Sequence, residues 1–152
     1  MKKVLALILS AIFVFSLTAC TKKEKNPATS EIMAKVKQEI TLPETADISK
    51  ENIDSYIASL KSDDITELSY VMAGDGISPD EVFIAKFNDD VDMEKVKGAL
   101  ETYKENKVSL FENYSADTYK IKDSQIIIKG KYAFFAMVED NKAATKIFTD
   151  FM

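Results

Sequence analysis

Carboxylates are the only plentiful side chains in this chain that could act as general acids or bases. The 152 residues include 25 Asp and Glu, a single Cys and no His. His-based catalysis, the Ser-His-Asp and Cys-His arrangements and His/Cys zinc sites are therefore excluded. Two adjacent acidic pairs occur, Asp63-Asp64 and Asp89-Asp90. Because neighbouring residues point in different directions, neither pair is set up to share a proton, and both are more typical of turns and helix caps.

One acidic segment resembles the start of a calcium-binding loop through its alternating polar residues, Asn88, Asp90, Asp92 and Glu94. Such a loop needs Gly at its sixth position, where this chain has Met93 or Lys95, depending on the residue that starts the count. Carboxylates at the positive end of a helix explain the segment more simply. The chain also lacks a phosphate-loop GK[ST] sequence and a Ser-x-x-Lys pair. We therefore expect no metal, no cofactor, no catalytic residue and no enzymatic activity.

The N-terminus has the pattern of an export signal. Lys2 and Lys3 precede an almost wholly apolar stretch over residues 4–17, which is short for a membrane-spanning helix and typical of a secretory signal. The stretch closes with Leu17-Thr18-Ala19-Cys20, which resembles the lipobox of bacterial lipoproteins. That resemblance implies that the Cys20 sulfur receives a diacylglyceryl group and that cleavage makes Cys20 the first residue. The alternatives are an ordinary signal peptide, or an uncleaved anchor with an incidental Cys.

This interpretation divides the chain into three segments. They are a lipoprotein signal peptide over residues 1–19, a lipid-anchored tether over 20–29 and a single domain over 30–152. The tether is polar, contains Pro27 and lacks periodicity, as flexible linkers do. Two or more acyl chains, such as palmitate, give stable membrane attachment. We therefore expect a domain anchored through Cys20 on the extracytoplasmic face of the cell membrane.

Apolar periodicity and turn residues predict the elements of an α+β domain. In chain order these are helices over 30–40 and 51–60, strands over 65–73 and 81–87, a helix over 93–114, strands over 125–129 and 132–138, and a helix after the acidic turn at 139–140. Ser30 and Ser49 are candidate N-caps of the first two helices. The fold class is thus a ββαββα-type antiparallel or mixed sheet covered by helices, preceded by one or two N-terminal helices.

Two details of this pattern have consequences for packing. Lys107 is the one break in the apolar face of the long helix. The second hairpin is almost continuously apolar, which predicts two central strands buried on both faces.

The stretches 82–89 and 133–140 both read as a strand, an acidic cap and a helix start. This similarity leaves a duplication of a ββα unit open.

The aromatic residues divide between packing and recognition. Tyr70, Phe83, Phe134 and Phe135 are expected in the core. Tyr114 and Tyr119 bracket the exit of the long helix, where they could line a surface for a ligand or partner. Tyrosines at a sheet edge more often pack their rings and leave their hydroxyls in water, so packing is the expectation here.

Most of the chain, from about Thr45 to Met152, resembles a bacterial lipoprotein family known as domain of unknown function 4358. The matching parts are a strand at 81–87, an acidic turn at 89–92, a charged helix at 93–111, Tyr114, strands at 125–129 and 132–138 joined through Gly130, an acidic turn at 139–140 and a helix at 143–151. The resemblance implies a location at the cell envelope and supplies no activity or site residue.

These observations lead to three functional hypotheses. The first is a membrane-anchored, non-catalytic module that binds a protein or an envelope polymer, for instance through an exposed edge strand. The second is a carboxylate-dependent enzyme acting on envelope glycan, with Asp75, Asp80 and Asp89 as candidate acids. The third is an accessory subunit of a membrane complex, with a flat apolar patch. A formal net charge of −5 argues against a nucleic-acid partner.

Overall fold

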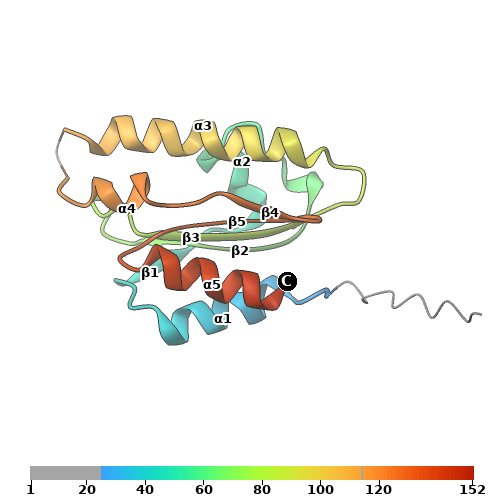
Figure 1. Cartoon of the computed structure of the whole chain (residues 1–152). Coiled ribbons are helices and arrows are strands. Elements are labelled where there is room, and N and C mark those ends of the chain that lie inside the picture. The colour runs from blue at the N-terminus through green and yellow to red at the C-terminus, as the bar shows by residue number, and fades with distance from the viewer. Residues whose placement is uncertain (1–24, 114) are drawn as a thin grey trace, which may run out of the picture.

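An antiparallel five-stranded sheet with helices on both faces forms the folded part of the chain, so the predicted α+β class is confirmed (Figure 1). The computed structural model describes residues 25–113 and 115–152. The strand order across the sheet is β1-β2-β3-β5-β4. The bounds are Thr45–Asp47 for β1, Ile65–Ala73 for β2, Glu81–Phe87 for β3, Ile127–Lys129 for β4 and Tyr132–Met137 for β5.

The two β-hairpins meet through their second strands, because β3 pairs with β5 in the middle of the sheet. The first hairpin has the predicted bounds. In the second, β5 is central and buried along its length, whereas β4 is a three-residue edge strand, so the prediction of two central strands is wrong for β4. The opposite edge is β1, a strand that the sequence pattern did not predict. Both edges are short, which limits pairing with an added peptide strand.

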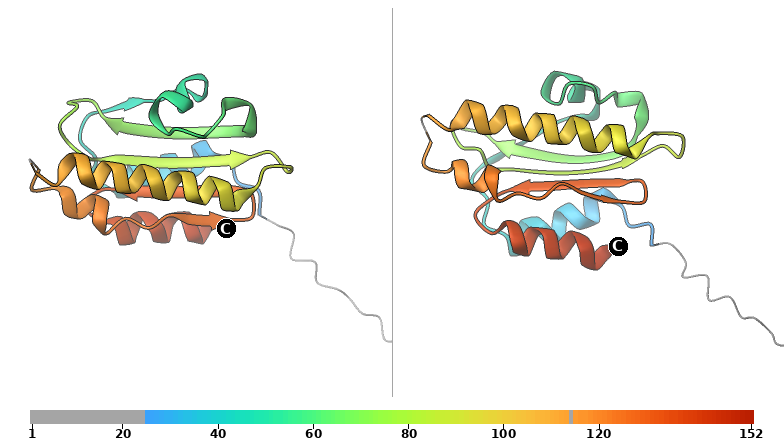
Figure 2. Two further views of the ribbon diagram at one scale, coloured as in Figure 1. Left: turned by 90° about the horizontal axis from the view of Figure 1, so that it is seen from above. Right: turned by 45° about the horizontal axis from the view of Figure 1, so that its top comes forward.

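The helices lie in two layers, one on each face of the sheet (Figure 2). One layer contains α2 (Ile53–Tyr56), α3 (Met93–Phe111) and α4 (Thr118–Lys122), together with the 3-10 turns η1 (Lys50–Asn52) and η2 (Ser62–Asp64). The other layer contains α1 (Thr29–Glu39) and α5 (Asn141–Phe151). Since α3 and α5 cover opposite faces, the two hairpin–helix units do not repeat one arrangement.

Alternation along the central strands builds two separate cores. Phe83 and Ala85 of β3 face the α3 layer, whereas Val82 and Ile84 face α1 and α5. A strand that is covered on both faces has apolar residues at most of its positions, which explains the continuous apolar run of β5. The four aromatic residues predicted for the core are confirmed there: Tyr70, Phe83, Phe134 and Phe135.

The helix starts agree in part with the predicted caps. The Asp92 carboxylate accepts the Glu94 N–H at 3.1 Å at the start of α3, and Asp140 accepts the Ala143 N–H at 2.9 Å at the start of α5. Capping therefore explains Asp92 in the segment that resembles a calcium loop, whereas Asn88 accepts the Thr66 hydroxyl and donates to the Asp63 carbonyl oxygen. The Ser30 prediction is wrong, because α1 begins at Thr29 with Ala28 as its N-cap residue. The predicted helix over 51–60 is reduced to η1 and the four residues of α2.

Different segments of the chain lie at the two ends of the sheet. At one end lie the β2–β3 turn, the end of β5 and the start of α5. At the other end, Lys25 and the C-terminus lie side by side, and the Lys25 ammonium donates to the Asp150 carbonyl oxygen at 3.0 Å (Figure 1). Within the described ranges, every helix is too short or too polar to cross a membrane.

Candidate functional site

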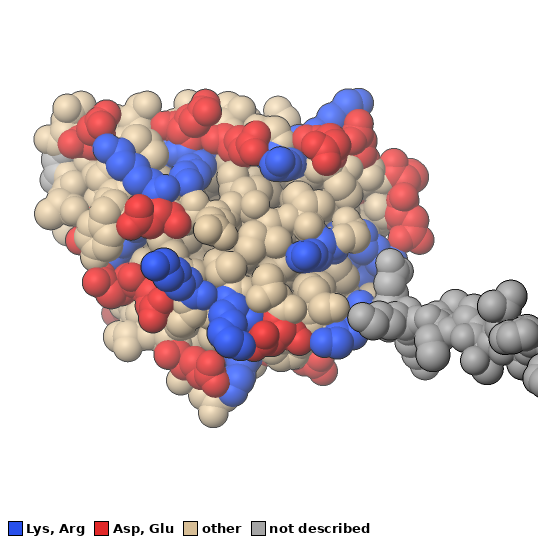
Figure 3. All heavy atoms as spheres, in the orientation of Figure 1, with Lys and Arg blue, Asp and Glu red and all other residues tan. Residues whose placement is uncertain are grey.

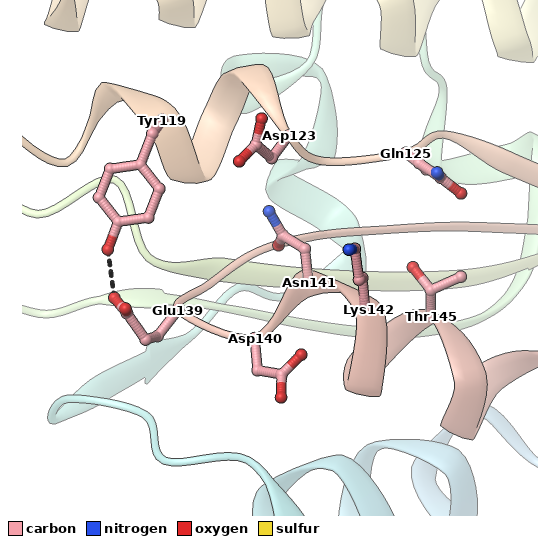
Figure 4. Close-up of a pocket in the computed structure, with 8 residues that line it drawn as sticks. All are labelled: Tyr119, Asp123, Gln125, Glu139, Asp140, Asn141, Lys142 and Thr145. Atoms are coloured by element: carbon pink, nitrogen blue, oxygen red, sulfur yellow. Dashed lines mark hydrogen bonds between the residues drawn. The ribbon is translucent and has the colours of Figure 1, made fainter.

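Two pockets open at the end of the sheet that lies away from Lys25. The hairpin pocket, of about 760 Å³, lies beside the β2–β3 turn and is lined by Asp75, Ile77, Ser78, Asp80, Asp117 and Lys120, among others. The helix pocket, of about 490 Å³, lies between α4 and the start of α5 (Figure 4). Its lining includes Tyr119, Asp123, Gln125, Asp140, Asn141 and Lys142. Glu139 lines both pockets. We call the surface formed by the two pockets and the exposed side chains around them the distal end.

Lys120 is the central charge of the distal end. Its ammonium lies 2.9 Å from Asp80 Oδ2, 3.5 Å from Asp117 Oδ2 and 3.9 Å from Glu139 Oε2. Burial acts to lower the pKa of Lys120, but the hydrogen bond to Asp80 and the surrounding negative charge outweigh it, so the pKa is raised. The ammonium therefore stays protonated near neutral pH and cannot serve as a base or a nucleophile.

Two of the three acids considered for an enzyme lie at the hairpin pocket, and both are engaged. Asp80 is buried, accepts the Ser78 hydroxyl and binds Lys120. Asp75 accepts the backbone N–H groups of Ile77 and Ser78 at 3.0 and 2.9 Å, which shapes the turn and lowers the pKa of Asp75.

The third candidate acid, Asp89, lies beyond the other end of β3. It is paired there with the Lys131 ammonium at 2.7 Å. Seven residues of β3 separate Asp80 from the segment that carries Asp89, a strand length of about 23 Å. The structure therefore does not bring the three acids together.

Tyr119 faces the helix pocket, so the expectation that its ring packs in the core is wrong. Its side chain is exposed (42 %), and its hydroxyl donates to the Glu139 carboxylate, which raises the pKa of Tyr119 (Figure 4). The reason is the short helix α4, whose buried positions are taken by Thr118 and Ile121. Tyr114, the other tyrosine of this prediction, lies outside the described residues.

Asn141 joins the two sides of the helix pocket. Its side-chain carbonyl accepts the Val138 N–H at 2.9 Å, and its amide donates to the Lys120 carbonyl oxygen at 2.7 Å. The side chain thus connects α4 to the junction of β5 and α5. Both functional groups are used, so Asn141 fixes the shape of the pocket rather than offering hydrogen bonds to a ligand.

Exposed apolar side chains gather at the distal end. Four large hydrophobic residues are exposed among the described residues: Tyr56, Ile77, Leu110 and Tyr119. Ile77 is in the β2–β3 turn and Tyr119 is on α4. Leu110 is in the last turn of α3, just before Ser115, which lines the hairpin pocket. Two of the four, Ile77 and Tyr119, therefore line the pockets.

A buried polar cluster lies directly behind this surface. Glu81, the residue after Asp80, is fully buried, and its Oε2 accepts the hydroxyls of Tyr70 and Tyr103 at 2.7 and 2.8 Å. The Lys107 ammonium lies 2.8 Å from Glu81 Oε1, as an ionic contact and not a hydrogen bond. Burial raises the pKa of both phenols, so they stay protonated and donate. The break at Lys107 in the helix pattern was the sequence signal for this pair.

The opposite end of the sheet binds residues 26–29, which the sequence pattern assigned to the flexible tether. The Tyr132 hydroxyl lies 2.9 Å from Asn26 Oδ1 and 2.8 Å from the Pro27 carbonyl oxygen. The Thr29 N–H donates to Glu67 at 3.1 Å, and Glu67 pairs with Lys86 at 2.9 Å. We call Glu67, Lys86 and Tyr132 the tether clamp. Its contacts hold residues 26–29 against the sheet.

Comparison with known proteins assigns the chain to a family without assigning it an activity. No curated protein and no solved structure matches the chain. The model of one family, described as a domain of unknown function (DUF4358), matches residues 38–138. This segment contains all five strands, α3, Lys120 and both halves of the Glu81–Lys107 pair. The chain therefore belongs to the family defined by this domain of unknown function.

Proposed function

We propose that the protein is a lipid-anchored, non-catalytic binding module of the bacterial cell envelope, and that the distal end is its binding surface. The observation that carries the proposal is the distal end itself. There, exposed Ile77 and Tyr119 line two pockets whose central charged groups are already paired with one another. Such a surface suits recognition, because its shape is fixed before a partner arrives.

The tether clamp supports anchoring at the opposite end. Lys25 follows Cys20 by five residues, which span at most about 18 Å when fully extended. An acyl group on Cys20 would therefore keep the clamp close to the membrane surface. The strands run between the clamp and the distal end, so these two surfaces lie at opposite ends of the sheet.

The state of the acids at the hairpin pocket supports binding over catalysis. A glycosidase needs two carboxyl groups about 5–10 Å apart, one acting as an acid and the other as a base or nucleophile. Here Asp80 is bound to Lys120, and Asp75 is used by the backbone of its own turn. The glycan-enzyme hypothesis therefore has less support than the binding module. The accessory-subunit hypothesis gains support from exposed Ile77, Leu110 and Tyr119.

Fatty-acid labelling tests the anchor. Cells producing the wild-type chain or Cys20→Ser are grown with a clickable palmitate analogue. We expect the label on the wild-type protein and its loss from Cys20→Ser, because no other cysteine is present. Label that persists in Cys20→Ser, or is absent from both proteins, would contradict the anchor.

Incubation with envelope glycan tests the absence of catalysis. We expect wild-type protein and Asp75→Asn to release no soluble sugar fragments. Asp75 is a suitable position because Asn removes the charge but keeps the Oδ1 acceptor for the Ile77 and Ser78 N–H groups, so that the substitution preserves the turn. Release by the wild type that is lost in Asp75→Asn would refute the binding module and restore the enzyme hypothesis.

A further inference from the structure

We propose that the distal end docks a basic segment of a protein partner, one that combines Lys or Arg with apolar side chains. The inference rests on the proposed function, since it names the class of partner for the same surface. Three independent features point to this class: the exposed apolar side chains, the excess of carboxylates and the position of the tether.

The apolar side chains point to a protein rather than to a small polar ligand. Ile77 is 72 % exposed and lines the hairpin pocket, and Tyr119 lines the helix pocket. Leu110 is 59 % exposed in the last turn of α3. Large exposed apolar groups that gather around a pocket are typical of protein interfaces, where Tyr in particular contributes binding energy. A ligand held only by hydrogen bonds would leave Ile77 and Leu110 without a role.

The charges at the distal end favour a basic partner. Six carboxylates line the two pockets, against the ammonium groups of Lys120 and Lys142. Lys120 is buried among its partners, whereas the side chains of Glu139 and Asp117 remain 71 % and 44 % exposed. Acidic and basic side chains are mixed over much of the drawn face, and acidic side chains also gather along its right-hand edge, at the other end of the molecule (Figure 3). At the distal end, the excess of carboxylates lies beside exposed apolar side chains, so a cationic segment with apolar residues would be attracted there.

The position of the tether indicates that the partner is a protein segment and not the membrane surface. The clamp lies at the opposite end of the strands, so anchoring through Cys20 would place the distal end outward. The lipid surface of bacterial membranes is commonly anionic, and the carboxylate excess would be repelled by it. A basic protein segment that reaches the distal end from outside, or from a protein next to the anchor, fits both the carboxylate excess and the position of the clamp.

The test uses the full chain in nanodiscs of uncharged phosphatidylcholine, so that it does not depend on acylation of Cys20. The probe is a fluorescent peptide of about ten residues that mixes Lys with Leu. The control peptides replace each Lys by Glu or by Gln. We expect anisotropy to report binding of the Lys peptide alone, and added salt to weaken that binding. Equal binding of the Glu peptide, or binding of none, would overturn the proposal.

Matched variants locate the binding. Tyr119→Ser is compared with Tyr56→Ser, since the two tyrosines are 42 % and 41 % exposed and only Tyr119 lines a pocket. Glu139→Gln is compared with Asp89→Asn, an exposed and lysine-paired acid at the other end. We expect Tyr119→Ser to weaken binding about tenfold or more, Glu139→Gln to weaken it about threefold, and each control to change it less than about twofold. Equal losses in the controls would overturn the assignment.

The outcomes separate this inference from the proposed function. Loss of the fatty-acid label in every form of the protein would remove the anchor and leave the peptide result standing. Binding of a soluble envelope glycan at the helix pocket, without binding of the Lys peptide, would keep a binding module and overturn the basic protein partner. Release of sugar fragments would refute the non-catalytic function whatever the peptide does.

Discussion

Removing the Lys107 ammonium should leave the buried Glu81 carboxylate without its cation. In Lys107→Met, an apolar side chain that ends at Cε replaces the stem of Lys107, and only the ammonium, which lies 5.6 and 5.7 Å from the centres of the Tyr103 and Phe111 rings, is lost. Glu81 remains fully buried but loses the cation 2.8 Å away. The two tyrosine hydroxyls still donate to its other oxygen. The change is therefore electrostatic, with little loss of packing.

The expected cost follows from this geometry. Breaking a buried ion pair by removing one partner costs about 3–5 kcal/mol, because an uncompensated charge stays behind. Since Glu81 keeps two hydrogen bonds, the lower value of about 3 kcal/mol applies. Domains of this kind have unfolding free energies of about 5–15 kcal/mol in total. A loss of this size should lower the urea midpoint by about 1.5 M for an m-value near 2 kcal/mol/M.

Urea unfolding tests the reasoning. Lys97→Met on the exposed side of α3 is the matched control, and we expect a change below about 0.5 kcal/mol. Glu81→Gln/Lys107→Met removes the uncompensated charge as well, so it should recover part of the stability that Lys107→Met loses. A deficit below about 1 kcal/mol for Lys107→Met, or no recovery in the double variant, would refute the account.

Three further predictions concern the tether clamp, a helix cap and a turn. The hydrogen bond from Lys86 lowers the pKa of Glu67, so the resulting stability is present above pH about 4.3 and is lost as the pH falls through the lowered pKa of the folded state. The difference in unfolding free energy between wild type and Glu67→Gln should therefore become smaller in acid. Acid titrations of both proteins would show this. Asp140→Ala should cost about 1 kcal/mol in urea unfolding by removing the cap of α5, whereas an unchanged midpoint would mean that the cap contributes nothing. Gly130→Ala should destabilise the folded protein by about 1–2 kcal/mol, because φ of Gly130 is +55° in the β4–β5 turn, whereas no neighbouring atom obstructs a Cβ. An unchanged urea midpoint would contradict this backbone strain.

Local patterns were sufficient for the parts of the fold in which one face or one turn decides the structure. The β2–β3 hairpin follows from two β-compatible runs around Gly74-Asp75-Gly76, and its strand bounds are those predicted. The helices α3 and α5 follow from apolar spacing and acidic caps. β4 was misplaced because its apolar run describes burial by neighbouring helices, and nothing in that run shows whether another strand lies beyond it.

Most of the candidate site could not be predicted from the sequence, because segments that are far apart in the chain form it. Tyr119 and Lys120 come from α4, Glu139 from the turn after β5, and Ile77 from the turn of the first hairpin. Their proximity depends on strand order and on which face each helix covers, and neither is encoded in local spacing. The carboxylates Asp75 and Asp80 were named in advance, but the cation that binds Asp80 lies forty residues further along the chain.

The adjacent acids at the start of β3 connect these observations. Asp80 binds Lys120 of α4, whereas Glu81, one residue later, turns inward and binds Lys107 of α3. Successive residues of one strand thus hold two helices, and the segment between these helices carries Ser115 and Asp117 of the hairpin pocket. A buried pair contributes little net stability over an apolar pair, but it penalises every arrangement that separates the two charges. These pairs therefore fix the position of α4 relative to the β2–β3 turn, and with it the spacing of Tyr119 and Ile77 that a partner would meet.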